Sequence, residues 1–294
     1  MKAADVPSEI QRQHQPNADT VRVLTYNIFG RHGNWEQRRP VLIEGLQVLA
    51  ADLIAFQETV VVDDFDQVAD LLAPGYAIVH SAARATDGTG CSIASRWPIA
   101  QVRELDLNVT PRTADFPCTT LLAEIDAPAP FGRLLFVNHF PDYQVDHERE
   151  RELQTVLAAR EIEVMVARHP MHVVLAGDLD AEPDAASLRF LTGKQSLAGT
   201  SVCYRNAWDS AHPDGKESGE TLSNRNSLSP AATGDWPFRR IDHLLVRHGP
   251  HGGPSLRIAA CELAFAQPIG DVWASDHFGL VADLTVPQPT IEAS

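Results

Sequence analysis

Runs of apolar and β-branched residues, each bounded by Gly, Pro or Asp, recur along the chain from residue 21 to residue 286. Such runs between turn-forming residues are typical of β-strands rather than helices, so strands are expected to dominate the fold. The sequence predicts nine of them, at 21–29, 52–59, 91–95, 119–125, 133–140, 172–180, 240–247, 256–265 and 278–286.

Three stretches with helical periodicity fall between these strands, at 36–50, 64–72 and 146–168. The third is predicted to begin with Asp146 as its N-cap and to end before Pro170, which cannot continue a helix. The apolar positions expected to share one face of this helix are Leu153, Val156, Leu157 and Val164.

No break in composition divides the chain, which indicates one mixed α/β (α+β) domain over residues 21–286. Two packed, mostly antiparallel sheets with helices outside accommodate both patterns. Residues 1–20 are predicted to be a disordered leader and 287–294 a flexible tail. The stretch 209–237 is rich in Gly, Pro, Ser and Asn, and a loop of that length is usually functional or disordered.

Charge and composition narrow the classes of protein that remain. The 294 residues include 24 Lys and Arg against 39 Asp and Glu, a formal net charge of −15. This balance disfavours a passive nucleic-acid binder, which needs a basic surface, although an acidic enzyme can still meet phosphate through a divalent cation. No apolar run is long enough for a membrane span and no secretory signal is visible, so a cytoplasmic location is expected. The four scattered cysteines argue against a zinc knuckle.

Polar side chains stand where the predicted apolar strands run out. Burying a carboxylate costs several kcal/mol unless it is paired or binds a metal. One carboxylate at the end of a predicted strand can be chance, but five carboxylates at such positions are hard to dismiss. The positions concerned are Asn27, Glu58, Asn138, His139, Asp178, Asp180, Asp242, His243, Asp276 and His277.

Each position also has an ordinary structural explanation. Asn27 fits a buried amide that bridges two strands, and the Asp178–Asp180 segment fits a turn that caps its own backbone. Asp242 lies close in sequence to two arginines, so a structural ion pair is an alternative there. His139 alone fits a core histidine. The ten positions taken together indicate a functional site more specifically than any one of them does.

Taken in order, six short segments of the chain resemble the endonuclease/exonuclease/phosphatase (DNase I-like) superfamily. They read LTYNI, FQE, NH, GDLD, RIDH and SDH, and the segment SIASRWPI also resembles a recurrent segment of that family. The similarity extends from about Val21 to Val286. It implies a four-layer α/β/β/α sandwich and metal-dependent hydrolysis of a phosphate ester.

The resemblance also implies roles for individual residues. Glu58 would be the principal ligand of Mg²⁺ or Mn²⁺, with Asn27 beside it and Asp276 nearby. His277 would be the base that takes a proton from the attacking water, held in the right tautomer by Asp242. These roles agree with general chemistry, because Mg²⁺ prefers oxygen ligands and a carboxylate partner fixes which histidine nitrogen is free.

On the substrate side, His139 would stabilise the phosphoryl oxygens or protonate the leaving group, and Asp178 would orient the nucleophile or transfer a proton. Asn138 and Arg96 are candidate substrate contacts. The chain departs from the family pattern at Asp180, where the family usually has Asn. A carboxylate repels a phosphoryl oxygen unless it is neutralised, so Asp180 predicts either a second metal ion or a less negatively charged substrate.

These observations favour a phosphodiesterase that acts on a small molecule or a lipid headgroup. A nuclease acting on DNA or RNA is the first alternative, which the net charge does not favour. A phosphomonoesterase and a non-catalytic binding protein on the same fold are further alternatives.

Overall fold

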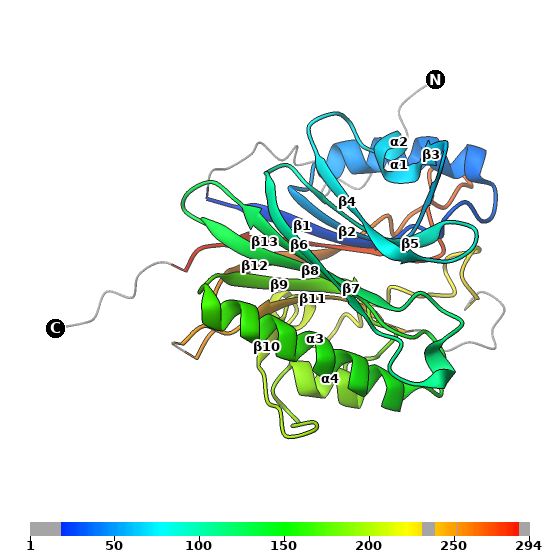
Figure 1. Ribbon diagram of the computed structural model, residues 1–294. Helices are drawn as coiled ribbons and strands as arrows, with labels where there is room; N and C mark the ends of the chain where they lie inside the picture. Colours follow the sequence, from blue (N-terminus) through cyan, green and yellow to red (C-terminus); the bar gives the residue numbers. More distant parts are fainter. Residues whose placement is uncertain (1–18, 231–238, 251, 288–294) are drawn as a thin grey trace.

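The structure is a computed structural model that describes residues 19–230, 239–250 and 252–287. The predicted leader and tail therefore lie almost entirely outside the described residues. Two sheets pack face to face, with helices on both outer faces (Figure 1). This is the predicted four-layer sandwich.

The first sheet has the order β12-β13-β1-β2-β5-β4, with β3 paired to β2 alone. Its one parallel pair is β1 with β2, while the other pairs on the path are antiparallel. The strands are β1 (Val21–Asn27), β2 (Leu53–Val62), β3 (Phe65–Asp66), β4 (Ala77–Arg84), β5 (Thr89–Ser95), β12 (Arg257–Ala264) and β13 (Gly279–Thr285).

The second sheet has the order β10-β11-β9-β8-β7-β6 and one parallel pair, β8 with β9. Its strands are β6 (Ile99–Asp106), β7 (Thr119–Asp126), β8 (Arg133–Phe140), β9 (His172–Asp178), β10 (Tyr204–Asn206) and β11 (Asp242–Arg247). All nine predicted strands are present in the two sheets, whereas β3, β4, β6 and β10 were not predicted.

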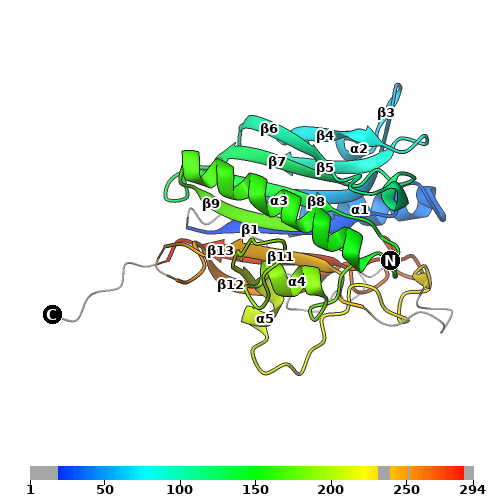
Figure 2. The same ribbon diagram turned by 60° about the horizontal axis from the view of Figure 1, so that its bottom comes forward.

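Helices complete the outer layers (Figure 2). Helix α1 packs against the first sheet, and α3 and α4 pack against the second. The helices are α1 (Trp35–Leu49), α2 (Gln67–Leu71), α3 (Glu148–Arg168), α4 (Ala186–Leu191) and α5 (Ala207–Ala211), with a 3₁₀ turn at Pro111–Thr113. No helix of the described part of the chain is long and apolar enough to cross a membrane.

The prediction for α3 is wrong at its N-cap and for three of the four residues expected on its buried face. The helix begins at Glu148 after His147, and Asp146 forms an ion pair with Arg112 instead of capping the helix. The face that packs on the second sheet is formed by Val156, Ala159, Ile162 and Met165, while Leu153, Leu157 and Val164 are exposed. Large apolar residues alone did not identify the buried face, because polar side chains share it near the N-terminal end.

Strand alternation decides which side chains enter the space between the sheets. On β1, Val21 and Val23 lie in the core between the sheets, while Leu24 and Tyr26 face α1. On β9, Val174 and Ala176 face inward in the same way. Because the side-chain period of a strand is two, the residues that continue these inward rows at the strand ends are Asn27 and Asp178. The fold thus directs polar side chains from both sheets toward one edge of the sandwich.

Candidate active site

The polar strand ends of the two sheets meet at one edge of the sandwich. In the second sheet, Asp178 ends β9 and Asp242 begins β11, and the two residues are direct cross-strand neighbours. In the first sheet, Asn27 ends β1, and His277 lies two residues before the start of β13, which pairs antiparallel with β1. The topology therefore brings together residues that are up to 250 positions apart in sequence.

The Asn27 carboxamide joins the two sheets. Its Nδ2 atom donates hydrogen bonds to Glu58 Oε1 and Asp178 Oδ2, both at 3.0 Å. Its Oδ1 atom accepts from the backbone N–H of Phe29, which fixes the orientation of the amide. Asn27 is therefore the bridging amide allowed by the sequence, and it also lies at the centre of the candidate site.

Glu58 reaches this centre through an irregularity in β2. Strand alternation would place it with Ile54 and Phe56, on the face covered by α1. The pairing of β2 with β5 shifts register between Phe56 and Thr59, and Glu58 has a φ of 55°. A β-bulge re-aims the side chain that it carries. Here it turns the Glu58 carboxylate toward Asn27, where the side chain remains partly exposed.

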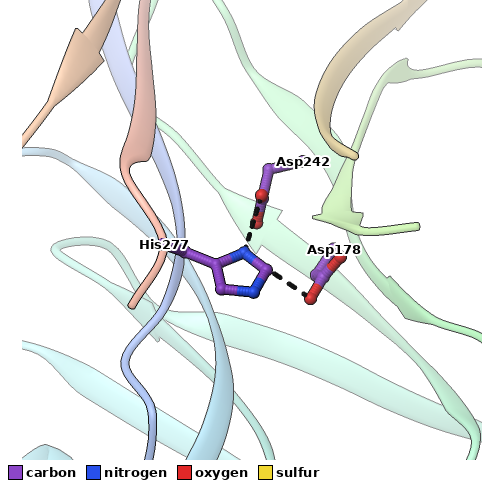
Figure 3. A group of neighbouring side chains, drawn as sticks. All are labelled: Asp178, Asp242 and His277. Atoms are coloured by element: carbon purple, nitrogen blue, oxygen red, sulfur yellow. Dashed lines mark hydrogen bonds and ion pairs between the residues drawn. The ribbon is translucent and has the colours of Figure 1, made fainter. Parts of the chain in front are cut away.

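Asp178, Asp242 and His277 form a compact buried cluster (Figure 3). The Nδ1 atom of His277 lies 3.0 Å from Asp242 Oδ2 and 3.9 Å from Asp178 Oδ2. The hydrogen bond with Asp242 fixes the imidazole and leaves Nε2 for another partner. Glycine at 177 permits the close approach of β9 to β8, because a Cβ there would collide with the carbonyl oxygen of His139.

The segment before β13 supplies the remaining acidic group. The Ser275 hydroxyl donates to the carbonyl oxygen of Asn27 at 2.7 Å and lies 3.2 Å from Asp276 Oδ1. Its oxygen also accepts from the backbone N–H of His277. These hydrogen bonds attach Asp276 and His277 to the end of β1.

The negative charge at this edge is only partly compensated within the protein. Burial and the nearby Asp276 raise the pKa of Glu58 to about 7. Burial and Asp242 raise the pKa of Asp178 to about 6. The pKa of Asp276 is raised by burial. For His277, burial lowers the pKa, but Asp242, Asp178 and Asp276 together raise it well above its ordinary value. The site therefore favours a bound positive charge.

The residues present suit a divalent cation. One ligand atom from each of Asp178, Asp242 and His277 lies within 4.8 Å of the others. Asp242 Oδ1 is buried and has no hydrogen-bond partner. An unpaired carboxylate oxygen in a buried acidic cluster is costly unless a cation approaches it. Oxygen-rich donor sets of this kind match the preference of Mg²⁺ and Mn²⁺.

Asp180 lies beside this cluster with its own cation. Its backbone has a φ of 47°, and its Oδ1 atom is 3.8 Å from Nη1 of Arg239, which also donates to the Asp180 carbonyl oxygen. Burial and Asp178 raise the pKa of Asp180 well above its ordinary value, while Arg239 opposes that shift. The guanidinium thus offsets part of the charge that distinguishes Asp180 from the expected Asn. Arg239 is one of the two arginines close in sequence to Asp242 that offered a structural ion pair there, and in the structure it lies beside Asp180.

His139 does not join the cluster. Its Nδ1 lies 2.7 Å from the Thr120 hydroxyl and its Nε2 lies 3.4 Å from the Thr155 hydroxyl, so the ring is buried between β7 and α3. It shares the outer face of β8 with Leu135 and Val137. The alternation of side chains along β8 would have predicted this outward position of His139 from the sequence. Burial lowers the pKa of His139 to about 3, which keeps the ring neutral.

Asn138 and Arg96 are not members of the acidic cluster either. Asn138 faces inward but uses its carboxamide within the protein, accepting from Gln57 and donating to the carbonyl oxygens of Phe56 and Ser92. Arg96 follows the end of β5 that pairs with the beginning of β2, and its guanidinium lies over the Tyr76 ring. The five residue steps from Leu53 to Glu58 span about 16 Å of strand, so Arg96 is at the opposite end of the sheet from Glu58.

The family assignment follows from a match over most of the chain. The endonuclease/exonuclease/phosphatase family matches residues 24–277, which includes every strand-end residue described above. The chain belongs to this family. No curated protein matches the chain in sequence.

Solved structures with the same fold are similar over most of their length. Truncated TDP2 from Caenorhabditis elegans has a TM-score of 0.69 and 18% identity, covering 91% of this chain and 98% of that one. An endonuclease/exonuclease/phosphatase from Bacteroides vulgatus has a TM-score of 0.69 and 17% identity, covering 91% and 99%. The human Nocturnin catalytic domain with bound sulfate has a TM-score of 0.69 and 16% identity, covering 91% and 95%. At these identities the likeness shows the fold.

Members of the endonuclease/exonuclease/phosphatase family are typically metal-dependent phosphoesterases. The buried group of Asp178, Asp242 and His277 is a candidate metal site in this chain. Family and site together make the chain a phosphoesterase of this family.

Replacing His139 by Asn should leave activity within about threefold of wild type, because the ring hydrogen-bonds to Thr120 and Thr155 on the outer side of the second sheet and not to the acidic cluster. The variant should also lose less stability on acidification. The unfolded state binds a proton below about pH 6.5, whereas the buried ring binds none until about pH 3. Stability therefore falls as pH decreases through this window.

Urea unfolding at pH 7 and pH 5 measures this difference. The His139→Asn variant should lose about 2 kcal/mol less than wild type between these two values. A folded variant whose hydrolysis rate drops a hundredfold would return His139 to the catalytic group.

Replacing Glu58 by Gln should stabilise the metal-free protein at pH 8. The raised pKa of Glu58 means that its ionisation costs stability as pH increases from about 4.5 to about 7, and the cost persists above that range. The expected gain is roughly 1–2 kcal/mol, reduced from the full shift by the partial exposure of the side chain.

Denaturant unfolding in EDTA checks the gain, and repetition at pH 4 is the control, where the two proteins should differ little. Adding Mg²⁺ should raise the unfolding midpoint of wild type more than that of Glu58→Gln. Equal Mg²⁺ responses would remove Glu58 from the metal site.

Proposed function

We propose that the protein is a divalent-metal-dependent phosphodiesterase that hydrolyses a small-molecule or lipid-headgroup diester. The observation that carries the catalytic part is the hydrogen bond between Asp242 and His277 within a cluster of carboxylates whose charge is not fully paired. A histidine held by a carboxylate at one nitrogen is suited to take a proton at the other. The same acidic surroundings supply oxygen ligands for a metal ion.

Each residue has a distinct task in this proposal. Glu58, Asn27 and Asp276 would hold Mg²⁺ or Mn²⁺, which would neutralise the phosphoryl oxygens and the leaving-group charge. The group of Asp178, Asp242 and His277 is also spaced to hold a cation, but in this proposal it serves proton transfer. Nε2 of His277 takes the proton from the attacking water, while Asp242 retains the hydrogen bond at Nδ1. Asp178, hydrogen-bonded to Asn27, orients the water or passes on a proton. The raised pKa of His277 fits this scheme only when part of the carboxylate charge is neutralised.

Charge and arginine usage favour a small diester over a nucleic acid. The net charge is −15. Several arginines already bind other groups of the protein. Arg84 donates to backbone carbonyl oxygens, Arg112 pairs with Asp146 and Glu150, and Arg239 pairs with Asp180. A nucleic-acid surface needs many cations free to meet phosphates.

One exposed cation lies near the candidate site. Arg225 stands over the ring of Phe278, the residue after His277, at 5.3 Å from guanidinium carbon to ring centroid. The loop that carries it is attached to this segment, because Asn226 donates to the Ser275 carbonyl oxygen and the Phe278 N–H donates to that of Thr221. An exposed guanidinium at this place suits the negative charge of a small phosphodiester.

Hydrolysis of bis-p-nitrophenyl phosphate tests the catalytic proposal. The wild type should turn it over with Mg²⁺ or Mn²⁺ and lose the activity in EDTA. His277→Ala and Glu58→Ala should each lose at least about 100-fold while remaining folded, the scale expected for loss of a general base or of the metal's anchor. Wild-type rates in either variant with metal present would refute the mechanism.

The dependence of kcat/KM on salt distinguishes the two substrate classes. With bis-p-nitrophenyl phosphate, raising KCl from 50 to 200 mM should change kcat/KM by less than about threefold, because few ions are released on binding. With a DNA oligonucleotide, a true nuclease should lose about 10³-fold or more over the same range, as contact with several phosphates requires. Efficient, steeply salt-dependent cleavage of DNA or RNA would favour the nuclease alternative.

A further inference from the structure

We infer that Arg38 is a positioning residue that holds two segments of the active site, residues 28–32 and residues 274–277, in their mutual arrangement. This inference rests on the proposed function, because it concerns how the residues of that site are kept in place. Arg38 lies on α1, and its side chain is the largest of those that are fully buried in the described part of the chain.

The guanidinium uses all five of its N–H groups on backbone carbonyl oxygens. Nε donates to His32, Nη1 donates to Ile28 and Ala274, and Nη2 donates to Phe29 and Gly30, at distances of 2.6–3.2 Å. Four of these acceptors lie within the five residues that follow Asn27 in sequence. The fifth, Ala274, precedes Ser275, Asp276 and His277. One side chain therefore connects the end of β1 to the segment that carries the candidate base.

This use of a buried arginine is unusual. Buried charges normally pair with an opposite charge, yet among the described residues no carboxylate lies within ion-pair distance of Arg38. Its positive charge is attracted by Glu58 and Asp276, which lie farther away. The side chain thus contributes a fork of five donors to the loop and a positive charge behind the acidic site. Lysine, with three donors on a single nitrogen, cannot reproduce the fork.

The loop that Arg38 holds needs such support. Phe29 and Gly30 have φ angles of 58° and 43°, so two consecutive residues adopt the left-handed conformation, and one of them is bulky. Backbone of this kind persists only where surrounding interactions over-determine it. The rings of Phe29 and Trp35 flank the guanidinium at 5.5 and 5.6 Å, which keeps its plane in place.

Arg38→Lys tests the inference, and Arg39→Lys is the matched control. Arg39 is the next residue on the same helix, but it forms an ion pair with Asp70 of α2 and its side chain is 41% exposed. At a temperature well below unfolding, Arg38→Lys should lower kcat for bis-p-nitrophenyl phosphate about 10- to 100-fold with KM within about threefold, because small misplacements of catalytic groups act mainly on rate. Arg39→Lys should change neither by more than twofold.

Hydrogen exchange of peptides covering 28–33 and 272–278 gives a readout that does not depend on activity. Both peptides should exchange at least tenfold faster in Arg38→Lys, whereas Arg39→Lys should leave them unchanged. Wild-type kcat together with wild-type exchange in 272–278 would overturn the inference. If the wild type hydrolyses no phosphate ester, the proposed function fails, and the exchange result alone decides the role of Arg38.

The wild-type protein provides the test if Arg38→Lys does not fold. Because one guanidinium holds both segments, their opening should be coupled, and amides in 28–33 and 274–277 should show protection factors within about threefold of each other in native-state exchange. Protection factors that differ by a hundredfold would show that the segments open independently and would reject Arg38 as their common support.

Discussion

Repulsion between carboxylates at one edge of the sandwich is the constraint on which the site depends. Asp178, Asp242 and Asp276 are buried there, with Glu58 partly exposed beside them. In a poorly hydrated environment such a group of like charges destabilises the fold unless cations or hydrogen-bond donors compensate it. The protein supplies part of that compensation through the Asn27 amide, the His277 imidazole and the more distant Arg38 guanidinium. The same deficit that costs stability in the metal-free protein would favour the binding of a cation.

The apolar sandwich makes this arrangement rigid. Half of the site comes from each sheet, so its geometry depends on how the sheets are fixed relative to each other. Directly behind the acidic cluster, the Asn138 carboxamide on β8 binds Gln57 and the Phe56 carbonyl oxygen of β2, and the Ser92 carbonyl oxygen of β5. Such a fully satisfied polar bridge in an apolar core specifies one relative placement of the sheets. Asn138 therefore serves the site through the fold rather than by touching substrate.

The sequence predicted the layers and most strands because apolar runs bounded by turn-forming residues are local signals. It also singled out Asn27, Asp178, Asp242 and His277, which stand where such runs end, and the structure brings these four residues together. His139 was predicted in the site from the order of the motifs, but the alternation of side chains along β8 places it on the outer face of the second sheet. The partners of Asp180 and Arg38 were not predictable, since both depend on segments that meet only in the folded chain.

Glu58 and Asp180, two residues of the candidate site, have positive backbone φ angles that the fold alone does not favour. Left-handed backbone at a residue with a side chain costs of order 1 kcal/mol, and glycine would remove that cost. Strand alternation would also direct Glu58 away from the site, so its carboxylate reaches Asn27 only because the bulge in β2 is retained. For the fold alone, the strained backbone and the poorly compensated charge both cost stability. A cation bound beside Glu58, as proposed, would offset the burial and the repulsion by Asp276 that raise the pKa of this carboxylate, and the cost in stability would then be recovered as binding free energy.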